Sequence, residues 1–129
     1  MREIKFRAWD KENEKMMKVS SLHLENKEIS VKENGTFRLF RMQDLMQFTG
    51  VKDKNGKEIY ENDLISCNKY KNIVVFFENG CFKIKYPKSD TTNTICTLDT
   101  FLEKYKCKIS GNIYENKNLL EENRWANTR

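Results

Sequence analysis

Three Asn-Gly pairs constrain the fold of this 129-residue chain more than any other feature of its sequence. They are Asn34-Gly35, Asn55-Gly56 and Asn79-Gly80. Each pair lies between two segments that have the composition of strands. Asn and Gly both tolerate the positive φ angles that the two central residues of a type I′ hairpin turn require. The sequence therefore predicts several antiparallel hairpins.

Strand-like alternation supports these hairpins. Residues 73–77 before the third pair are β-branched or aromatic, and residues 82–86 after it alternate between apolar side chains and lysines. The opening segment from Arg2 to Trp9 also alternates, with Ile4, Phe6 and Ala8 on one face. A period of two residues indicates strands with one buried face. Gly50 is expected to allow a bend, and residues 87–93 to form a loop.

Two short helices are expected near the C-terminus. Apolar side chains recur with helical spacing at Leu98, Phe101, Leu102 and Tyr105. Thr97 is placed to cap the first helix, and Asn116 the second. The predicted fold class is mainly β: a small curled sheet or barrel of antiparallel hairpins, with two short C-terminal helices.

Nothing in the sequence has the pattern of a catalytic or metal site. The four cysteines are 14, 15 and 11 residues apart, without the close pair that usually begins a zinc site. The single histidine, His23, is flanked by two leucines and has no evident nucleophile to activate. Gly-rich phosphate loops are absent. We therefore expect no enzyme activity, no metal, no cofactor and no small-molecule substrate.

The net charge of +5 comes from 18 lysines and 6 arginines set against 19 acidic residues. Lysine-rich surfaces are often simply solvated, and specific base recognition favours arginine. Clustered lysines and an exposed aromatic ring nevertheless suit an interaction surface. The candidate interaction residues are Trp9, Lys52, Lys54, Lys57, Lys83, Lys85 and Lys88. For Trp9, packing under a loop or in a subunit contact is the competing interpretation.

Residues 45–65, which read LMQFTGVKDKNGKEIYENDLI, resemble the signature of the YopX family of phage and prophage proteins. The opening REIKFRAWD and the later GNIYEN at residues 111–116 are also similar to family segments. Asn62 stands where the family usually has glycine, and Lys117 where it usually has proline. Asn tolerates left-handed geometry and proline at a helix start is dispensable, so neither departure threatens the fold.

The resemblance implies an SH3-like small barrel within a single domain that covers residues 1–129. We expect an N-terminal β part over residues 1–44, a barrel-like core over residues 45–115, and a terminal helix and tail over residues 116–129. The family supplies no reaction to carry over, and a small barrel alone does not define a function. Asp63 is expected to accept hydrogen bonds from turn amides.

Two functional hypotheses follow. The favoured one is a phage or prophage accessory protein that acts without catalysis, through protein–protein interaction or as a homo-oligomer; inhibition of a host factor or defence system fits this class. The alternative is sequence-nonspecific nucleic-acid binding through the lysine-rich surface. The charged N-terminus and the lack of a long apolar run predict a cytoplasmic protein without a membrane partner.

Overall fold

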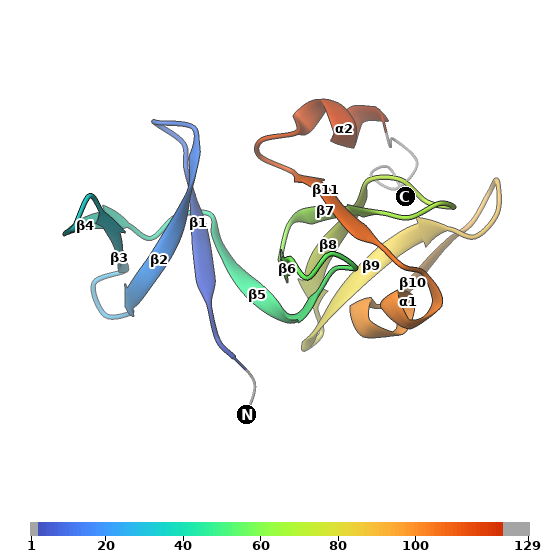
Figure 1. The fold of residues 1–129 in the computed structure, drawn as a ribbon, viewed down its shortest axis with the longest axis horizontal. Coiled ribbons are helices and arrows are strands. Elements are labelled where there is room, and N and C mark those ends of the chain that lie inside the picture. Colours follow the sequence, from blue (N-terminus) through green and yellow to red (C-terminus); the bar gives the residue numbers. More distant parts are fainter. Residues whose placement is uncertain (1–2, 123–129) are drawn as a thin grey trace. The chain divides into compact units, whose positions relative to one another are not determined.

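The computed structural model describes residues 3–122, and it divides into two compact units, Met1–Phe48 and Thr49–Arg129. Both units are built mainly from antiparallel strands (Figure 1). The chain passes from one unit to the other within β5. The finer subdivision expected at residues 44/45 and 115/116 stays a prediction. The expected tail, with Trp125, lies outside the described residues.

The first unit contains β1 to β4 and the beginning of β5. These strands are β1 (Phe6–Asp10), β2 (Lys15–His23), β3 (Glu28–Glu33), β4 (Thr36–Arg41) and β5 (Leu45–Lys52). Their order in space is β4-β3-β2-β1-β5, with every neighbouring pair antiparallel. One face buries Ala8, Met17, Ile29 and Val31. A bulge between Val19 and Ser21 interrupts the β2–β3 register, and bulges bend the strands that carry them.

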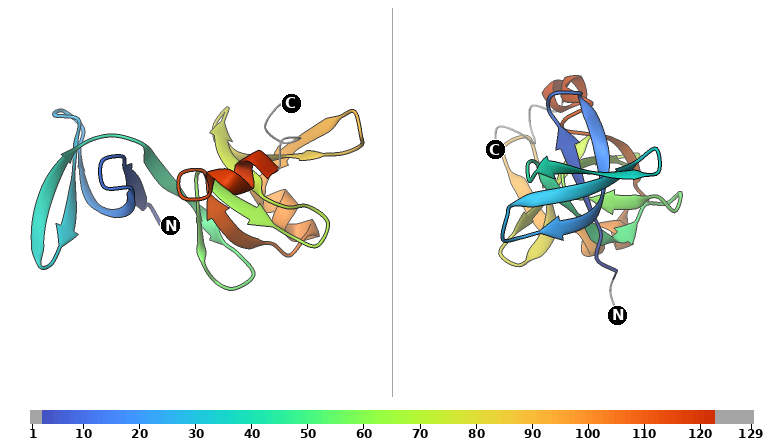
Figure 2. Two further views of the ribbon diagram at one scale, coloured as in Figure 1. Left: turned by 90° about the horizontal axis from the view of Figure 1, so that it is seen from above. Right: turned by 90° about the vertical axis from the view of Figure 1, so that its left-hand side faces the viewer.

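The second unit contains the rest of the chain. Its elements are β6 (Glu58–Tyr60), β7 (Asp63–Ser66), β8 (Ile73–Glu78), β9 (Cys81–Pro87), β10 (Asn93–Thr97), α1 (Leu98–Lys104), β11 (Lys108–Asn112) and α2 (Lys117–Glu122). Five of its strands form a sheet in the order β10-β9-β8-β7-β11. Helix α1 packs near β9 and β10 (Figures 1 and 2). Its Leu98 and Phe101 complete an apolar core with Ile65, Ile84 and other strand residues.

The expected fold class is confirmed in its main features. The structure is mainly β, its strands pair as antiparallel hairpins, and two short helices lie near the C-terminal end of the described chain. The sheets are curled rather than closed into a barrel, since each strand order has two ends. One expected element is corrected: the loop is shorter than residues 87–93, because Asn93–Thr97 pairs with β9 as β10. Neither helix in residues 3–122 has the length and apolar character needed to cross a bilayer.

Two of the three Asn-Gly pairs form the expected turns. Asn34-Gly35 and Asn79-Gly80 each close a two-residue hairpin, and all four residues have positive φ. Asn55-Gly56 is different, because Gly56 has positive φ and Asn55 does not. That turn is longer, since Asp53 N–H donates to the Lys57 carbonyl at 2.8 Å. This turn is held by the side-chain carboxylate of Asp53, and only one of its two central residues, Gly56, is left-handed.

The carboxylate of Asp53 holds this turn and ties it to β11. Its Oδ1 accepts the N–H groups of Asn55 at 2.8 Å and Lys57 at 2.9 Å. Its Oδ2 accepts the N–H of Ile109 at 3.0 Å, 56 residues further along the chain. Burial opposes ionisation of Asp53, but these three backbone donors outweigh it and hold its pKa below the ordinary value.

A second buried aspartate shapes the turn between β6 and β7. Asp63 Oδ2 accepts the N–H of Tyr60 at 2.8 Å, which confirms the expected role of this side chain in a turn. Asn62, within the same turn, has a φ of +70°. Its backbone N–H donates to Val75 O and its carbonyl accepts from Ile113 N, so the strained residue is held from both sides.

Substitution of Asn62 tests this left-handed position. We expect Asn62→Ala to lower the free energy of unfolding by about 1 kcal/mol, because a Cβ without a compensating side chain disfavours positive φ. Asn62→Gly should be nearly neutral. Urea unfolding followed by circular dichroism measures both. Asn68→Ala is the control, because Asn68 is exposed and has no positive φ; an equal loss in the control would contradict the argument.

Substitution of Asp53 tests the anchor. Asp53→Asn keeps the shape but removes acceptor capacity, which should lower the free energy of unfolding by about 1–3 kcal/mol at neutral pH. Because the folded-state pKa lies below the unfolded one, the contribution is present above about pH 4 and is lost as the pH falls through the folded-state pKa. The difference between wild type and variant should therefore shrink in acid.

Denaturant unfolding at neutral and acidic pH measures this dependence. Asp90→Asn makes the same chemical change at an exposed position in the β9–β10 connection and should leave stability unchanged. A pH-independent difference for Asp53→Asn would show that the carboxylate charge is not what holds the turn.

Candidate functional site

Five exposed lysines come together where the β5–β6 turn meets the start of β11. Lys54 N–H donates to the Cys107 carbonyl at 2.9 Å, and this bond adds to the Asp53–Ile109 contact. Two segments about fifty residues apart in sequence are thereby held side by side. We call their exposed lysines the lysine platform: Lys52, Lys54, Lys57, Lys106 and Lys108. Lys52, Lys54 and Lys57 are among the candidate interaction residues of the sequence analysis. Lys106 and Lys108 join them through the hydrogen bond from Ile109 N–H to Asp53, a long-range contact that no sequence pattern indicates.

The lysine platform keeps its charge available to a ligand. Among the ion pairs found in residues 3–122, none involves these five ammonium groups. Two carboxylates adjoin these lysines in sequence. Asp53 is only 7% exposed and is already hydrogen-bonded to three backbone amides, and Glu58 is half-buried. The platform is therefore a concentration of unpaired positive charge on a fixed backbone.

The other lysines proposed from the sequence lie on and after β9. Lys83 is half-buried and pairs with Glu78 at 3.6 Å, and Lys85 is also half-buried. Lys88 is exposed in the β9–β10 connection. As expected, Lys83 and Lys85 point away from the core face that carries Ile84. Partial burial and the ion pair make them poorer candidates for an interaction surface than the lysine platform.

Trp9 does not present an exposed ring. It is buried, with 9% of its surface accessible, and its backbone N–H donates to the Asp44 carbonyl at 3.2 Å. The alternation in β1 had placed Trp9 on the polar side of the strand. The structure corrects its assignment as a surface residue, since both Ala8 and Trp9 are buried. This favours the competing interpretation, in which Trp9 is a packing residue.

Strand β4 carries an exposed apolar surface that sequence reasoning missed. It is the terminal strand of the first unit's sheet, and Phe37 and Leu39 are 64% and 62% exposed. The signal was available in the sequence TFRLFR, which has large apolar residues on both faces of one strand. Phe40 on the opposite face packs on the core, so only Phe37 and Leu39 are left outside it.

The backbone of β4 is exposed at the same two residues. Glu33 and Thr36 close the two-residue turn, and such a closing pair exchanges both of its hydrogen bonds. Alternation along the strand then directs the N–H and C=O of Phe37 and Leu39 away from β3. The register runs without a bulge from Thr36 to Arg41, so this edge is regular.

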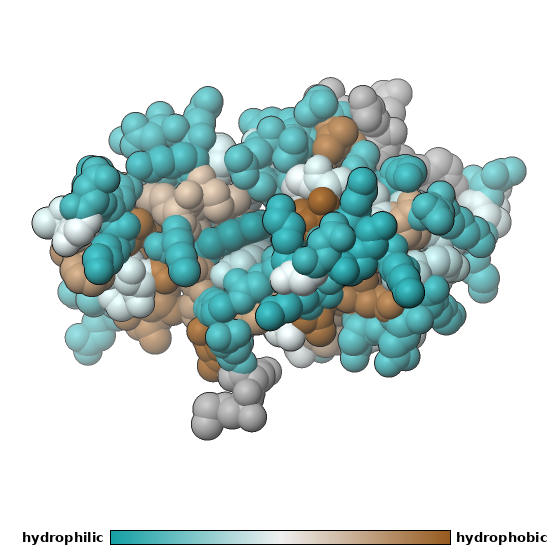
Figure 3. Space-filling view, in the orientation of Figure 1, coloured by the Kyte–Doolittle hydropathy of each residue, from teal (hydrophilic) through white to brown (hydrophobic). Residues whose placement is uncertain are grey.

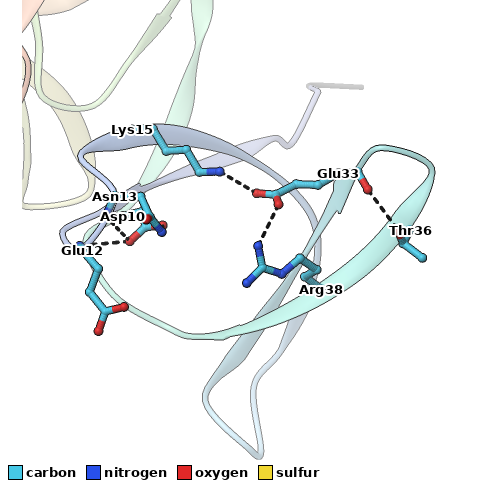
Figure 4. Close-up of polar contacts among 7 residues, drawn as sticks. All are labelled: Asp10, Glu12, Asn13, Lys15, Glu33, Thr36 and Arg38. Atoms are coloured by element: carbon cyan, nitrogen blue, oxygen red, sulfur yellow. Dashed lines mark hydrogen bonds and ion pairs between the residues drawn. The ribbon is translucent and has the colours of Figure 1, made fainter.

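Ion pairs fix the strands behind this edge (Figure 4). Glu33 accepts from Lys15 Nζ at 2.9 Å through Oε1 and from Arg38 at 3.0 Å through Oε2. Hydrogen bonds from Lys15 and Arg38 hold the pKa of Glu33 below its ordinary value. One carboxylate thus links β2, β3 and β4, and Arg38 is already occupied on the face opposite to Phe37.

A group of half-buried tyrosines lies beside α1. Tyr70 contacts Tyr86 and Tyr105 with ring centroids 4.9 and 5.4 Å apart. Lys69 Nζ lies 5.5 Å from the Tyr70 ring centre. The phenol groups of Tyr70 and Tyr105 raise the pKa of Lys69 above its ordinary value.

Two of the four thiols are in the environment of structural rather than reactive cysteines. Cys67 and Cys107 are buried in the core, and burial, together with the adjacent Cys67 thiol, raises the pKa of Cys107 to about 12. A thiol with so high a pKa is a poor nucleophile. Cys81 and Cys96 are half-buried free thiols.

His23 lies at the edge of an open, shallow depression formed by residues 22–26. It is exposed, and its Nε2 is 3.3 Å from the Ser21 hydroxyl. In the part of the chain that the structure describes, no three His, Cys, Asp or Glu side chains are grouped so as to hold a metal ion. The surface seen in Figure 3 is largely hydrophilic, with smaller apolar areas between charged side chains.

Comparisons with known proteins bear on the fold and the family. The crystal structure of protein EF1440 from Enterococcus faecalis is similar, with a TM-score of 0.60 and 24% sequence identity over 93% of this chain and 99% of that chain. At this identity the likeness concerns the fold. A comparison with curated proteins finds no match. The family model described as YopX protein matches residues 5–121. Because that match spans nearly the whole chain, this protein belongs to the YopX family.

Proposed function

We propose that this protein acts without catalysis, by binding another protein at the free edge of β4. The observation that carries the proposal is the coincidence, at Phe37 and Leu39, of outward backbone groups with exposed apolar side chains. An extended partner segment could hydrogen-bond to this edge and bury both side chains. This is recognition by strand addition, in which the backbone supplies affinity and alternate side chains supply specificity.

The features of β4 differ from those that normally protect a sheet edge. Edge strands are commonly made short, bulged, or interrupted by proline or inward-pointing charge. β4 has six residues in unbroken register, and its exposed face carries a phenylalanine and a leucine. An edge that is protected only by cationic side chains suits a strand whose partner is supplied by another chain.

The charges around β4 favour a different protein over a second copy of this chain. β4 carries Arg38 and Arg41 and no carboxylate, and Lys32 Nζ lies 5.8 Å from the Phe37 ring centre. Arg38 lies on the other face and is paired with Glu33, so the cations beside Phe37 and Leu39 are Arg41 and Lys32, and two β4 strands brought together would set these like charges against each other. A partner strand that alternates apolar and acidic side chains would instead complement both the apolar surface and the cations.

Family membership agrees with an accessory role of this kind. We place the partner among host or phage proteins, and inhibition is the expected effect where the bound segment is one that the partner needs for its own activity. Cys67 and Cys107 are buried, and His23, although 3.3 Å from the Ser21 hydroxyl, is exposed in an open depression, which supports binding rather than catalysis.

The test is capture of proteins from a nuclease-treated bacterial lysate by the tagged protein and by the variant Phe37→Lys/Leu39→Lys. We expect the wild type to retain a protein in stoichiometric amount, and the variant to bind it at least tenfold more weakly, because central apolar residues dominate interface energies. Hydrogen exchange should show new protection at the amides of Phe37 and Leu39 in the complex.

Ile95→Lys is the matched control, since Ile95 is also exposed and lies on β10, the terminal strand of the other sheet. It should bind the partner as the wild type does. Capture that survives Phe37→Lys/Leu39→Lys would refute the β4 site. A wild-type homodimer that this variant converts to a monomer, measured by light scattering, would replace the proposed partner with a second copy.

A further inference from the structure

We infer that the lysine platform is a second binding site, and that its ligand is the phosphodiester backbone of a nucleic acid. The site lies in the second unit, apart from the proposed β4 edge in the first. It takes a ligand of a different class, so the two proposals stand or fall separately.

The first argument is geometric. The hydrogen bonds from Ile109 N–H to Asp53 and from Lys54 N–H to Cys107 O fix the β5–β6 turn against the chain that leads into β11. Lys54 and Lys57 on the turn therefore share a surface with Lys106 and Lys108, without a conformational change on binding. Preorganised charge loses less free energy to ordering than charge gathered from mobile loops.

The second argument is electrostatic. The two segments that form the site, residues 52–58 and 103–108, contain six lysines and three carboxylates. One of these carboxylates, Asp53, is buried and hydrogen-bonded to backbone amides, which leaves Glu58 and Glu103 against the six lysines. The phosphodiester backbone of a nucleic acid carries a regular row of negative charges, which would neutralise this excess of positive charge.

The third argument concerns the residue type and its surroundings. Lysine supplies point charges without the bidentate geometry that reads base edges, so the site is suited to the backbone rather than to a sequence. The neighbouring Tyr70 and Tyr105 rings contact each other and pack against the apolar core, so phosphate contacts are expected to supply the binding free energy.

The experiment measures the fluorescence anisotropy of labelled oligonucleotides, one single-stranded and one duplex. Each probe is about 20 nucleotides long, which is longer than the usual binding site of a small domain. Binding is followed between about 50 and 200 mM salt. The test variant is Lys54→Gln/Lys57→Gln/Lys106→Gln/Lys108→Gln. The control is Lys18→Gln/Lys27→Gln/Lys88→Gln/Lys117→Gln, which removes four exposed lysines outside the platform.

We expect the wild type to bind at least one of the two probes at low salt, with affinity that falls steeply as salt is added. The platform variant should bind at least tenfold more weakly, and its salt slope should be lower by about 3, because each lost phosphate contact removes about 0.7–0.9 from the slope. The control variant should stay within about threefold of the wild type, since remote charges are largely screened.

A further variant, Asp53→Asn, keeps every lysine but loosens their arrangement. Asp53→Asn should lower the affinity for the oligonucleotide, but by a smaller factor than the platform variant does. Absence of wild-type binding to both probes at low salt would overturn the proposal. Equal weakening by the platform and control variants would also overturn it, because net charge and not this site would then explain the binding.

Discussion

The arrangement of the second unit depends on one buried carboxylate. Asp53 accepts two amides of its own turn and one from β11, so it defines a local structure and a long-range contact at once. Burying a charge is unfavourable unless hydrogen bonds satisfy it, and here three backbone donors do most of this, with a smaller contribution from the charge of Lys57. Among the ion pairs found in residues 3–122, none joins Asp53 to a lysine of the platform. The same residue that shapes the turn leaves its positive charges unpaired.

Local turn chemistry accounts for what could be predicted from the sequence. The hairpins at Asn34-Gly35 and Asn79-Gly80 depend only on residues that tolerate positive φ, and the helix at Leu98 only on apolar spacing. Asn55-Gly56 has the same two residues, but the carboxylate of Asp53, two residues earlier, accepts hydrogen bonds from Asn55 and Lys57 and so stabilises a longer turn. Asn62 retains the left-handed conformation of a position at which glycine is usual in the family, because its conformational tolerance is close to that of glycine.

Contacts between distant segments account for what could not be predicted. The alternation in β1 does not reveal that Trp9 is buried along with Ala8, since burial depends on what covers each face. Asn93, the last residue of the expected loop, begins β10 because it pairs with Pro87 of β9. The lysine platform depends on a hydrogen bond that spans 56 residues. Composition indicated an interaction surface, but only the fold shows which lysines share one.

The regular, apolar edge of β4 also affects the tendency of the protein to aggregate. An edge that accepts one particular strand is open to any extended chain with exposed backbone, including partly folded copies of the same protein. Arg41 and the nearby Lys32 oppose such self-association only through charge, and this opposition weakens as ionic strength rises. If β4 binds a partner strand as proposed, synthesis in step with that partner would limit the number of unoccupied copies, each of which adds to the risk of aggregation. Occupancy of β4 would then protect solubility as well as serve recognition.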